Sequence, residues 1–180
     1  MDDIASHIGM SKKTIYQYYD EKDKLIIEIT SSQIEFQLCE METIRSESSN
    51  PVQELLSAMN SMSKMMNKIR PTVFYDMQKY YPSAWMKFKE FKNKRLTDYV
   101  EANLRQGIET GLYRENLDIK IMARLRLEEV ELGFNPEVFP PEKFNIPEVQ
   151  IAMMDHFLHG IVTLKGHRLI NKYKQIHEEE

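Results

Sequence analysis

The sequence is poor in cysteine, in glycine and in long apolar runs. It has one cysteine, Cys39, and six glycines in 180 residues. A single cysteine excludes an internal disulfide and is typical of a reducing compartment, so we expect a cytoplasmic protein. No apolar run approaches the roughly 18 residues that a membrane-spanning helix needs, and no signal peptide precedes the first motif. We therefore expect no membrane partner.

The sequence also has few of the patterns that indicate strands or catalytic sites. It shows no sustained alternation of apolar and polar residues, and no glycine-rich phosphate loop, nucleophile elbow or zinc motif. An enzyme that uses a metal is the rival interpretation, and its candidates are Glu128, Glu129, Glu131, Asp155, His156 and His159. No Glu-x-x-His pair occurs among them, as a metal site in a helical bundle would require. We predict an all-α protein that is not an enzyme and has no cofactor and no metal.

The first 25 residues carry the pattern on which the rest of the interpretation depends. Apolar residues, Ala5 among them, recur at helical spacing up to Ile8, and Gly9 follows where a helix can end in a left-handed conformation. Ser11 can then cap a second helix over residues 12–19. Two short helices joined by a turn of about four residues that contains glycine form a helix-turn-helix.

The outward face of the second helix favours DNA as its partner. No acidic residue lies between Ser11 and Tyr19, where two lysines, a threonine, a glutamine and several tyrosines occur. Side chains at the start of such a helix can reach base edges in the major groove, and Gln17 can pair with adenine. A helical hairpin without any role in nucleic-acid binding is the alternative.

The stretch DDIASHIGMSKKTIYQYYDEKDKLI resembles the DNA-binding signature of TetR-family (tetracycline-repressor-like) transcription regulators. The resemblance implies an all-helical homodimer that represses transcription from a palindromic double-stranded DNA operator and leaves it when a small effector binds the C-terminal domain. It implies phosphate contacts by Tyr16, Tyr18 and Lys22, although Tyr18 can instead belong to the core. From their places on the helix, Lys13, Thr14 and Gln17 are expected to contact bases. The full predicted DNA-binding set is Ser11, Lys12, Lys13, Thr14, Tyr16, Gln17, Tyr18 and Lys22. Family members usually carry a further helix before this motif, and we expect it to be absent from this chain.

The remaining pattern divides the chain into a head and a body. We predict a DNA-binding head over residues 1–27, a connecting helix over 22–45 that Asp20 caps, and an effector-binding and dimerisation domain over 46–180. Apolar periodicity and caps predict body helices over 51–69, 72–80, 83–107 or 83–111, 118–130 and 147–173, with an irregular connection over 133–147 and an acidic tail at Glu178, Glu179 and Glu180. Pro71 is expected to end the first of these helices.

Charge is distributed unevenly along the chain, whose net charge is −4. Residues 61–95 carry nine lysines and arginines and two acids, whereas 30–60 and 109–150 each sum to −4. The basic stretch can face DNA phosphates or an acidic effector. It can equally be the solvated face of a helix.

The last predicted helix is apolar on more than one side, which predicts that it packs on two partners. One side would face its own body, and the other would face the same helix of a second subunit in a homodimer. Together with the helix that begins at Asp118, this would give an isologous four-helix interface. The predicted interface residues are Met154, Leu158, Ile161, Val162 and Leu164. A helix wholly buried within the monomer is the alternative.

The body is rich in methionine and aromatic residues, which can line a pocket for a small and largely apolar effector. The predicted pocket residues are Met59, Met62, Met66, Phe74, Met77, Trp85, Phe88, Tyr99 and Met122. Without the family resemblance, methionine and aromatic residues at helical spacing indicate ordinary core packing and not a pocket. The alternative function is a dimeric helix-turn-helix regulator that a protein partner controls, or that has no small-molecule inducer.

Overall fold

The computed structural model describes residues 1–70 and 72–175 of the chain, and these residues form helices throughout. The helices are α1 Asp2–Ile8, α2 Lys12–Tyr18, α3 Lys22–Glu47, α4 Pro51–Met66, α5 Val73–Tyr80, α6 Pro82–Phe91, the π-helical turn η1 Lys92–Leu96, α7 Thr97–Glu109, α8 Ile119–Gly133, α9 Ile146–Ile161 and α10 Leu164–Lys174. Within the described part, β pairing is limited to one isolated bridge between Tyr113 and Val162. The predicted all-α fold is confirmed. Pro71 and the predicted acidic tail lie outside the described residues.

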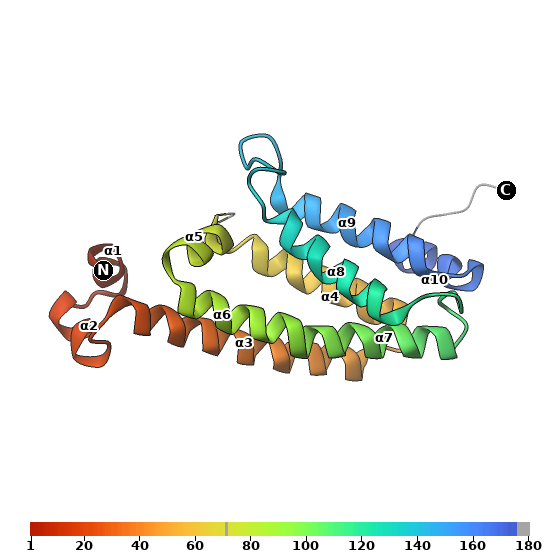
Figure 1. Ribbon diagram of the computed structural model, residues 1–180, viewed down its shortest axis with the longest axis horizontal. Helices are drawn as coiled ribbons and strands as arrows, with labels where there is room; N and C mark the ends of the chain where they lie inside the picture. The colour runs from red at the N-terminus through yellow and green to blue at the C-terminus, as the bar shows by residue number, and fades with distance from the viewer. Residues whose placement is uncertain (71, 176–180) are drawn as a thin grey trace.

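The molecule is elongated, with a two-helix head at one end of a helical body (Figure 1). The long helix α3 leaves the head and runs beside α6, and α4 lies between α3 and the pair formed by α8 and α9. No helix in residues 1–70 and 72–175 is long and apolar enough to cross a membrane. The body core is built mainly by α4, α7, α8 and α9 around Leu104, Leu158 and Ile161.

Caps predicted from the sequence explain where several body helices begin. The Asn50 Oδ1 atom accepts a hydrogen bond from the Gln53 N–H at 3.0 Å, and Pro51 occupies the first turn of α4. The Asp118 Oδ1 atom likewise accepts from the Ile121 N–H at 3.0 Å at the start of α8. The prediction that Asp20 caps α3 is wrong. Glu21 is the N-cap residue, and Asp20 instead accepts a hydrogen bond from Lys24.

The predicted long helix over 83–107 is present, but a π-helical turn interrupts its hydrogen bonding at Lys92–Leu96. A π turn inserts one residue and rotates the following residues around the helix axis. It accompanies burial of Lys92, whose ammonium group pairs with Glu128 and Glu131 of α8. Apolar periodicity in the sequence does not reveal such an insertion.

The prediction of one helix over 147–173 is wrong, because the chain breaks between α9 and α10. Val162 is extended, and the Thr163 hydroxyl accepts from the Gly166 N–H to start α10. The extended backbone pairs with the loop before α8, where the Thr163 N–H donates to the Leu112 carbonyl at 2.9 Å. The extended backbone at the break therefore supplies a hydrogen-bond partner to the buried Leu112 backbone.

This arrangement also contradicts most of the predicted dimer interface. Met154, Leu158, Ile161 and Val162 are buried in the core of the monomer itself, so they are not available to a second subunit. Only Leu164, at the start of α10, is exposed. The helical period predicted that these residues are buried, but not that the core of the monomer itself buries them.

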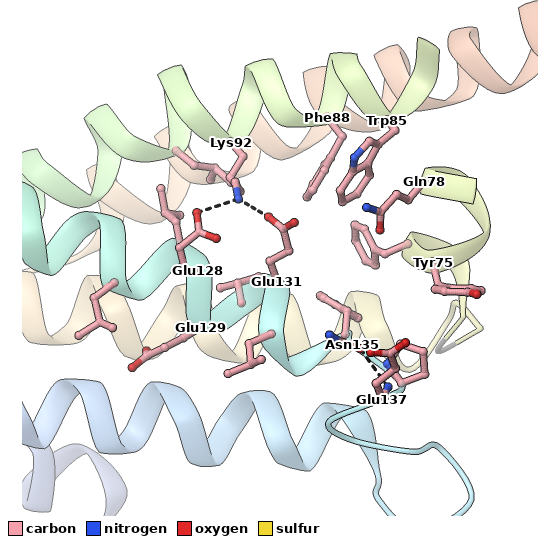
Figure 2. A pocket seen from close by; sticks show the side chains of 18 residues that line it. Tyr75, Gln78, Trp85, Phe88, Lys92, Glu128, Glu129, Glu131, Asn135 and Glu137 are labelled. Atoms are coloured by element: carbon pink, nitrogen blue, oxygen red, sulfur yellow. Dashed lines mark hydrogen bonds and ion pairs between the residues drawn. The ribbon is translucent and has the colours of Figure 1, made fainter. Parts of the chain in front are cut away.

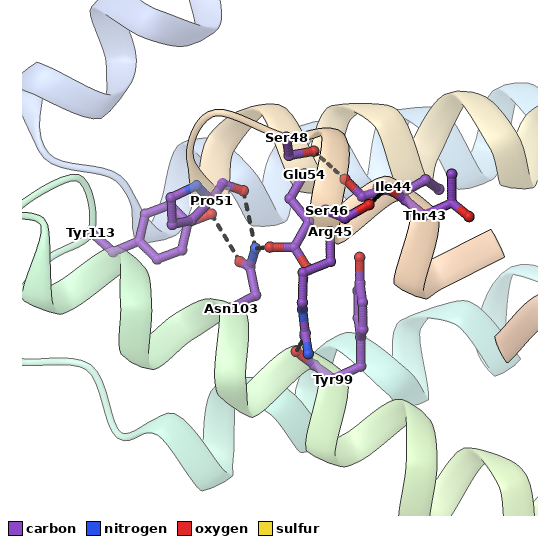
Figure 3. Close-up of polar contacts among 10 residues, drawn as sticks. All are labelled: Thr43, Ile44, Arg45, Ser46, Ser48, Pro51, Glu54, Tyr99, Asn103 and Tyr113. Carbon is purple, nitrogen blue, oxygen red and sulfur yellow. Dashed lines mark hydrogen bonds and ion pairs between the residues drawn. The ribbon is translucent and has the colours of Figure 1, made fainter. Parts of the chain in front are cut away.

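A buried polar network ties the end of α3 to α4 and α7 (Figure 3). The Asn103 amide donates to the Pro51 carbonyl at 3.1 Å and to Glu54 at 2.9 Å, and it accepts from the Tyr113 hydroxyl at 3.0 Å. Arg45 completes the network by donating to the Glu54 carboxylate. Since each buried polar group of this set has a partner, the network positions α3 relative to the core.

Two buried tyrosines make stability sensitive to alkaline pH. Burial raises the pKa of the Tyr99 and Tyr113 phenols above the ordinary value of 10.0. The folded state then holds protons that the unfolded chain releases, so stability is fully present below pH 10 and falls above it. We expect a loss of about 1.4 kcal/mol per pH unit for each tyrosine. Urea unfolding on both sides of pH 10 measures this slope.

The Tyr99→Phe variant is the matched control for this slope. The Tyr99 hydroxyl makes no geometrically defined hydrogen bond among the described residues, although the Glu54 carboxylate beside it helps to raise its pKa, so its removal should change stability at neutral pH only slightly. Above pH 10 the variant should lose stability less steeply than the natural chain. Identical slopes for the two proteins would contradict the role given to Tyr99.

Candidate nucleic-acid interface

The head is held together by a very small core. Ala5 on α1 and Ile15 on α2 are its buried side chains, and the small alanine lets the two helices approach. Gly9 has φ 68°, a left-handed conformation that glycine adopts at little cost, and the Met10 N–H after it donates to the Ala5 carbonyl at 2.9 Å. This turn sets the angle at which α2 leaves α1.

The start of α2 is fixed by its own polar side chains. The Ser11 hydroxyl accepts a hydrogen bond from the Thr14 N–H at 3.0 Å and lies 2.8 Å from the Thr14 hydroxyl. Ser11 is therefore the N-cap that the sequence predicted. Thr14 is half-buried and paired with Ser11. The contact between the two hydroxyls therefore orders the first turn of α2 in the protein without DNA.

Four other predicted residues project into solvent from α2. Lys13, Tyr16, Gln17 and Tyr18 are exposed, and Tyr18 is the most exposed of them at 78%. The possibility that Tyr18 belongs to the core is excluded by this exposure. Lys13 and Gln17 make no hydrogen bond or ion pair with any residue that the structure describes, so both side chains are free to meet a partner.

The two remaining predicted residues already have partners within the chain. Lys12 forms an ion pair with Asp2 of α1 at 2.6 Å, and this contact raises the pKa of Lys12 and lowers the pKa of Asp2. Lys22 lies over the ring of Tyr81, with its Nζ atom 5.2 Å from the ring centroid, and the Tyr81 phenol raises the pKa of Lys22. Tyr81, which the sequence analysis missed, joins the head to the α5–α6 corner of the body.

The body contains an apolar cavity of about 380 Å³ between α3, α4, α7 and α8. Six of the nine predicted pocket residues line it, and these are Met62, Met66, Phe74, Met77, Phe88 and Tyr99. Met59 is buried in the main core instead, and Met122 packs against that core. Sequence analysis missed Arg126, which also lines the cavity, because a charged residue on a helix normally indicates a solvated face.

A second cavity, of about 570 Å³, lies between α5, α6 and the end of α8 (Figure 2). Trp85 of the predicted pocket lines this cavity, together with Phe74 and Phe88. Its wall carries several charged side chains, among them Lys92, which pairs with both Glu128 and Glu131. The first cavity is therefore the better candidate for an apolar ligand.

Comparisons with known proteins find similarity in the head and, at low identity, over nearly the whole chain. Residues 1–29 match the family model described as "Bacterial regulatory proteins, tetR family". The chain is 24% identical over 164 residues to the uncharacterized HTH-type transcriptional regulator YvaF of Bacillus subtilis strain 168. The aligned residues are 91% of this chain and 85% of the relative.

Two solved structures share the fold at low identity. A TetR-family transcriptional regulator from Agrobacterium tumefaciens aligns with a TM-score of 0.74 at 14% identity, covering 90% of this chain and 86% of that one. FadR of Thermus thermophilus, a TetR-family repressor in complex with lauroyl-CoA, aligns with a TM-score of 0.57 at 17% identity, covering 89% and 83%.

The family match falls on the residues that build α1, the Gly9 turn, α2 and the start of α3. The relative that matches nearly the whole chain is itself named an HTH-type transcriptional regulator. Residues 1–29 therefore form a tetR-family DNA-binding head, and the chain is similar over nearly its whole length to a helix-turn-helix transcriptional regulator.

Proposed function

We propose that the protein is a repressor that binds a palindromic operator as a homodimer and leaves it when a small apolar effector enters the body. The observation that carries the proposal is the face of α2, where Lys13, Tyr16 and Gln17 are exposed beside a capped helix start. These residues have the chemistry to read base edges and to contact phosphates.

The half of the body nearer the head supports binding to a polyanion. Lys79 on α5 and Lys87 and Lys89 on α6 are exposed, and both helices lie toward the head in Figure 1. Basic side chains near the reading helix add attraction to phosphates without specifying sequence. This placement gives the basic stretch of the sequence a role beyond solvation.

A revised dimer interface replaces the one that burial excludes. On α8, Ile121, Leu125 and Leu132 are exposed at a spacing that places them on one stripe, and Ile151 of the neighbouring helix α9 is also exposed. We propose that this face packs on the same face of a second copy, which gives an isologous four-helix interface. Leu164 is the one residue of the predicted set that remains exposed.

Effector control rests on the cavity and on its position between head and body helices. The same long helix α3 follows α2 directly and contributes Ile34, Met41 and Ile44 to the cavity wall. A guest that moves α3 would therefore move the reading helix. FadR of Thermus thermophilus, the TetR-family repressor solved with lauroyl-CoA, shares this fold.

The proposal is tested by binding of the 180-residue protein to DNA from upstream of its own gene, in the presence of excess competitor DNA. We expect protection of a palindromic segment whose half-sites lie about one or more helical turns apart. Equal affinity for this DNA and for a scrambled duplex would contradict specific binding to an operator. If no compound in a broad set of apolar compounds raises the melting temperature of the protein, the proposal of a small apolar effector is wrong.

A further inference from the structure

One charged residue in the cavity of about 380 Å³ is buried without adequate partners. The Arg126 side chain is only 3% exposed, and it is the sole base among the described residues that line this cavity. Its Nε and Nη1 groups have no hydrogen-bond partner in the described part of the chain. Burial of a charge that is not hydrogen-bonded is costly, so this arrangement needs an explanation.

Contacts within the protein only partly compensate the guanidinium. Glu129 forms an ion pair with the Arg126 Nη1 atom at 3.6 Å, which is too long for a hydrogen bond. The Phe157 ring lies 6.0 Å from the guanidinium carbon, at the limit of a cation–π contact. Burial lowers the pKa of Arg126 and raises the pKa of Glu129. The Nε and Nη1 donors of Arg126 thus remain unpaired and buried in the wall of the cavity.

The other charged groups of this region do not fill that need. Glu128 and Glu131 point from α8 toward Lys92, whereas Glu129 leaves α8 on the other side (Figure 2). Glu40 lines the cavity from α3, and no described ion pair joins it to Arg126. Two buried acceptors without partners, Glu129 Oε2 and Gln150 Oε1, belong to residues that do not line this cavity. An entering molecule would therefore find an unpaired donor at this wall.

The remaining wall determines what else the molecule must be. Most of its surface comes from methionine, aliphatic and aromatic side chains such as Met62, Met66 and Phe91. Its polar members are largely occupied, since the Thr30 hydroxyl donates to the Ile26 carbonyl and the Gln37 amide donates to the Met65 sulfur. One end of the ligand is therefore an acceptor, and the rest is apolar.

We propose that the effector is an amphipathic monocarboxylate, whose carboxylate pairs with Arg126 and whose apolar body fills the methionine-rich cavity. A guanidinium presents two parallel N–H groups that match the two oxygens of a carboxylate. This inference rests on the proposed effector control and names the ligand class for it. Arg126 acts here as a binding residue.

The test is isothermal calorimetry with decanoate, used below its micelle-forming concentration, and with decanol as the neutral probe of equal length. We expect decanoate to bind the natural protein, and Arg126→Met to weaken it on the order of 100-fold while decanol binding is unchanged. Removing Arg126 leaves the Glu129 carboxylate without its ion pair, so the variant without ligand should be less stable than the natural chain, and the titrations are run at a temperature at which both proteins are folded. Equal decanoate affinity in both proteins would overturn the inference.

Glu129→Gln is the matched variant on the same helix. It removes the negative charge beside Arg126 and keeps nearly the same shape, so decanoate should bind several-fold more tightly, whereas a neutral ligand should not respond. Weaker decanoate binding in this variant would contradict a carboxylate at this position. Lack of binding by decanoate to the natural protein overturns the inference as well.

DNA binding separates the failure of this inference from failure of the proposed function. If decanol but not decanoate releases the operator, effector control stands and the carboxylate class is wrong. If decanoate binds through Arg126 but no operator is found, the ligand class stands and the proposed repressor function fails.

Discussion

Ile121→Glu is expected to convert the protein from a dimer to a monomer and to lower operator affinity by about 100- to 10,000-fold. Ile121 is 63% exposed on the α8 stripe. In a symmetric interface the new carboxylate of one subunit would lie near the same carboxylate of the second subunit, and the two negative charges would repel each other. A dimer binds two half-sites, and binding of its second head is intramolecular once the first head is bound. This effect raises operator affinity by about 100- to 10,000-fold, and a monomer lacks it. Sedimentation velocity and fluorescence anisotropy on operator DNA measure the two effects.

The substitution should leave the monomer folded. Ile121 lies in the first turn of α8, where an acidic side chain is favoured by the helix dipole, and its backbone N–H keeps the Asp118 cap. Met86→Glu is the matched control, because Met86 is 70% exposed on α6, away from the stripe. That variant should remain dimeric. A dimeric Ile121→Glu protein with full DNA affinity would place the interface elsewhere.

Gln17→Ala is expected to change which sequences the protein prefers. A bidentate pair between an amide side chain and adenine is worth about 1–3 kcal/mol of discrimination. We therefore expect the preference for the natural base at one position of each half-site to fall by about 10- to 100-fold, whereas binding to non-specific DNA changes little. Competition between operators that differ at single positions, measured with the natural protein and the variant, checks this expectation.

Lys22→Met and Tyr16→Phe are the controls for this result, since both side chains are assigned to phosphates. They should lower affinity for all sequences alike, and Lys22→Met should also reduce the slope of affinity against salt by about one. Loss of Lys22 also removes its contact with the Tyr81 ring, so Tyr81→Leu serves to measure that contact alone. A change of sequence preference in Lys22→Met would contradict the division of roles.

The head was predictable because its residues act over short distances. Gly9 at a left-handed turn, Ser11 as a cap and Ile15 as the buried contact each follow from positions a few residues apart. The caps at Asn50 and Asp118 were predictable for the same reason. Exposure of Lys13, Tyr16 and Gln17 then follows from the helical period once Ile15 is buried.

The dimer face was not predictable in the same way. Apolar residues at α9 predict burial but not whether the monomer or a second copy provides it, and the packing of α9 on α4 and α8 places Leu158 and Ile161 in the core of the monomer. The break at Thr163 was not predicted from the sequence, whose apolar pattern indicated one helix. Its importance depends on the loop at Leu112, which is distant in sequence and needs partners for its backbone.

By itself, the sequence determined the helical class and the helix-turn-helix head that matches the tetR family model, because caps, turns and apolar periodicity are local properties of the chain. The tertiary structure alone decided which apolar residues remain exposed, where the cavity lies and that Arg126 is buried in its wall. Burial and hydrogen-bond satisfaction depend on contacts between segments far apart in sequence. For that reason a charged residue that looked like part of a solvated helix became the proposed anchor for a ligand.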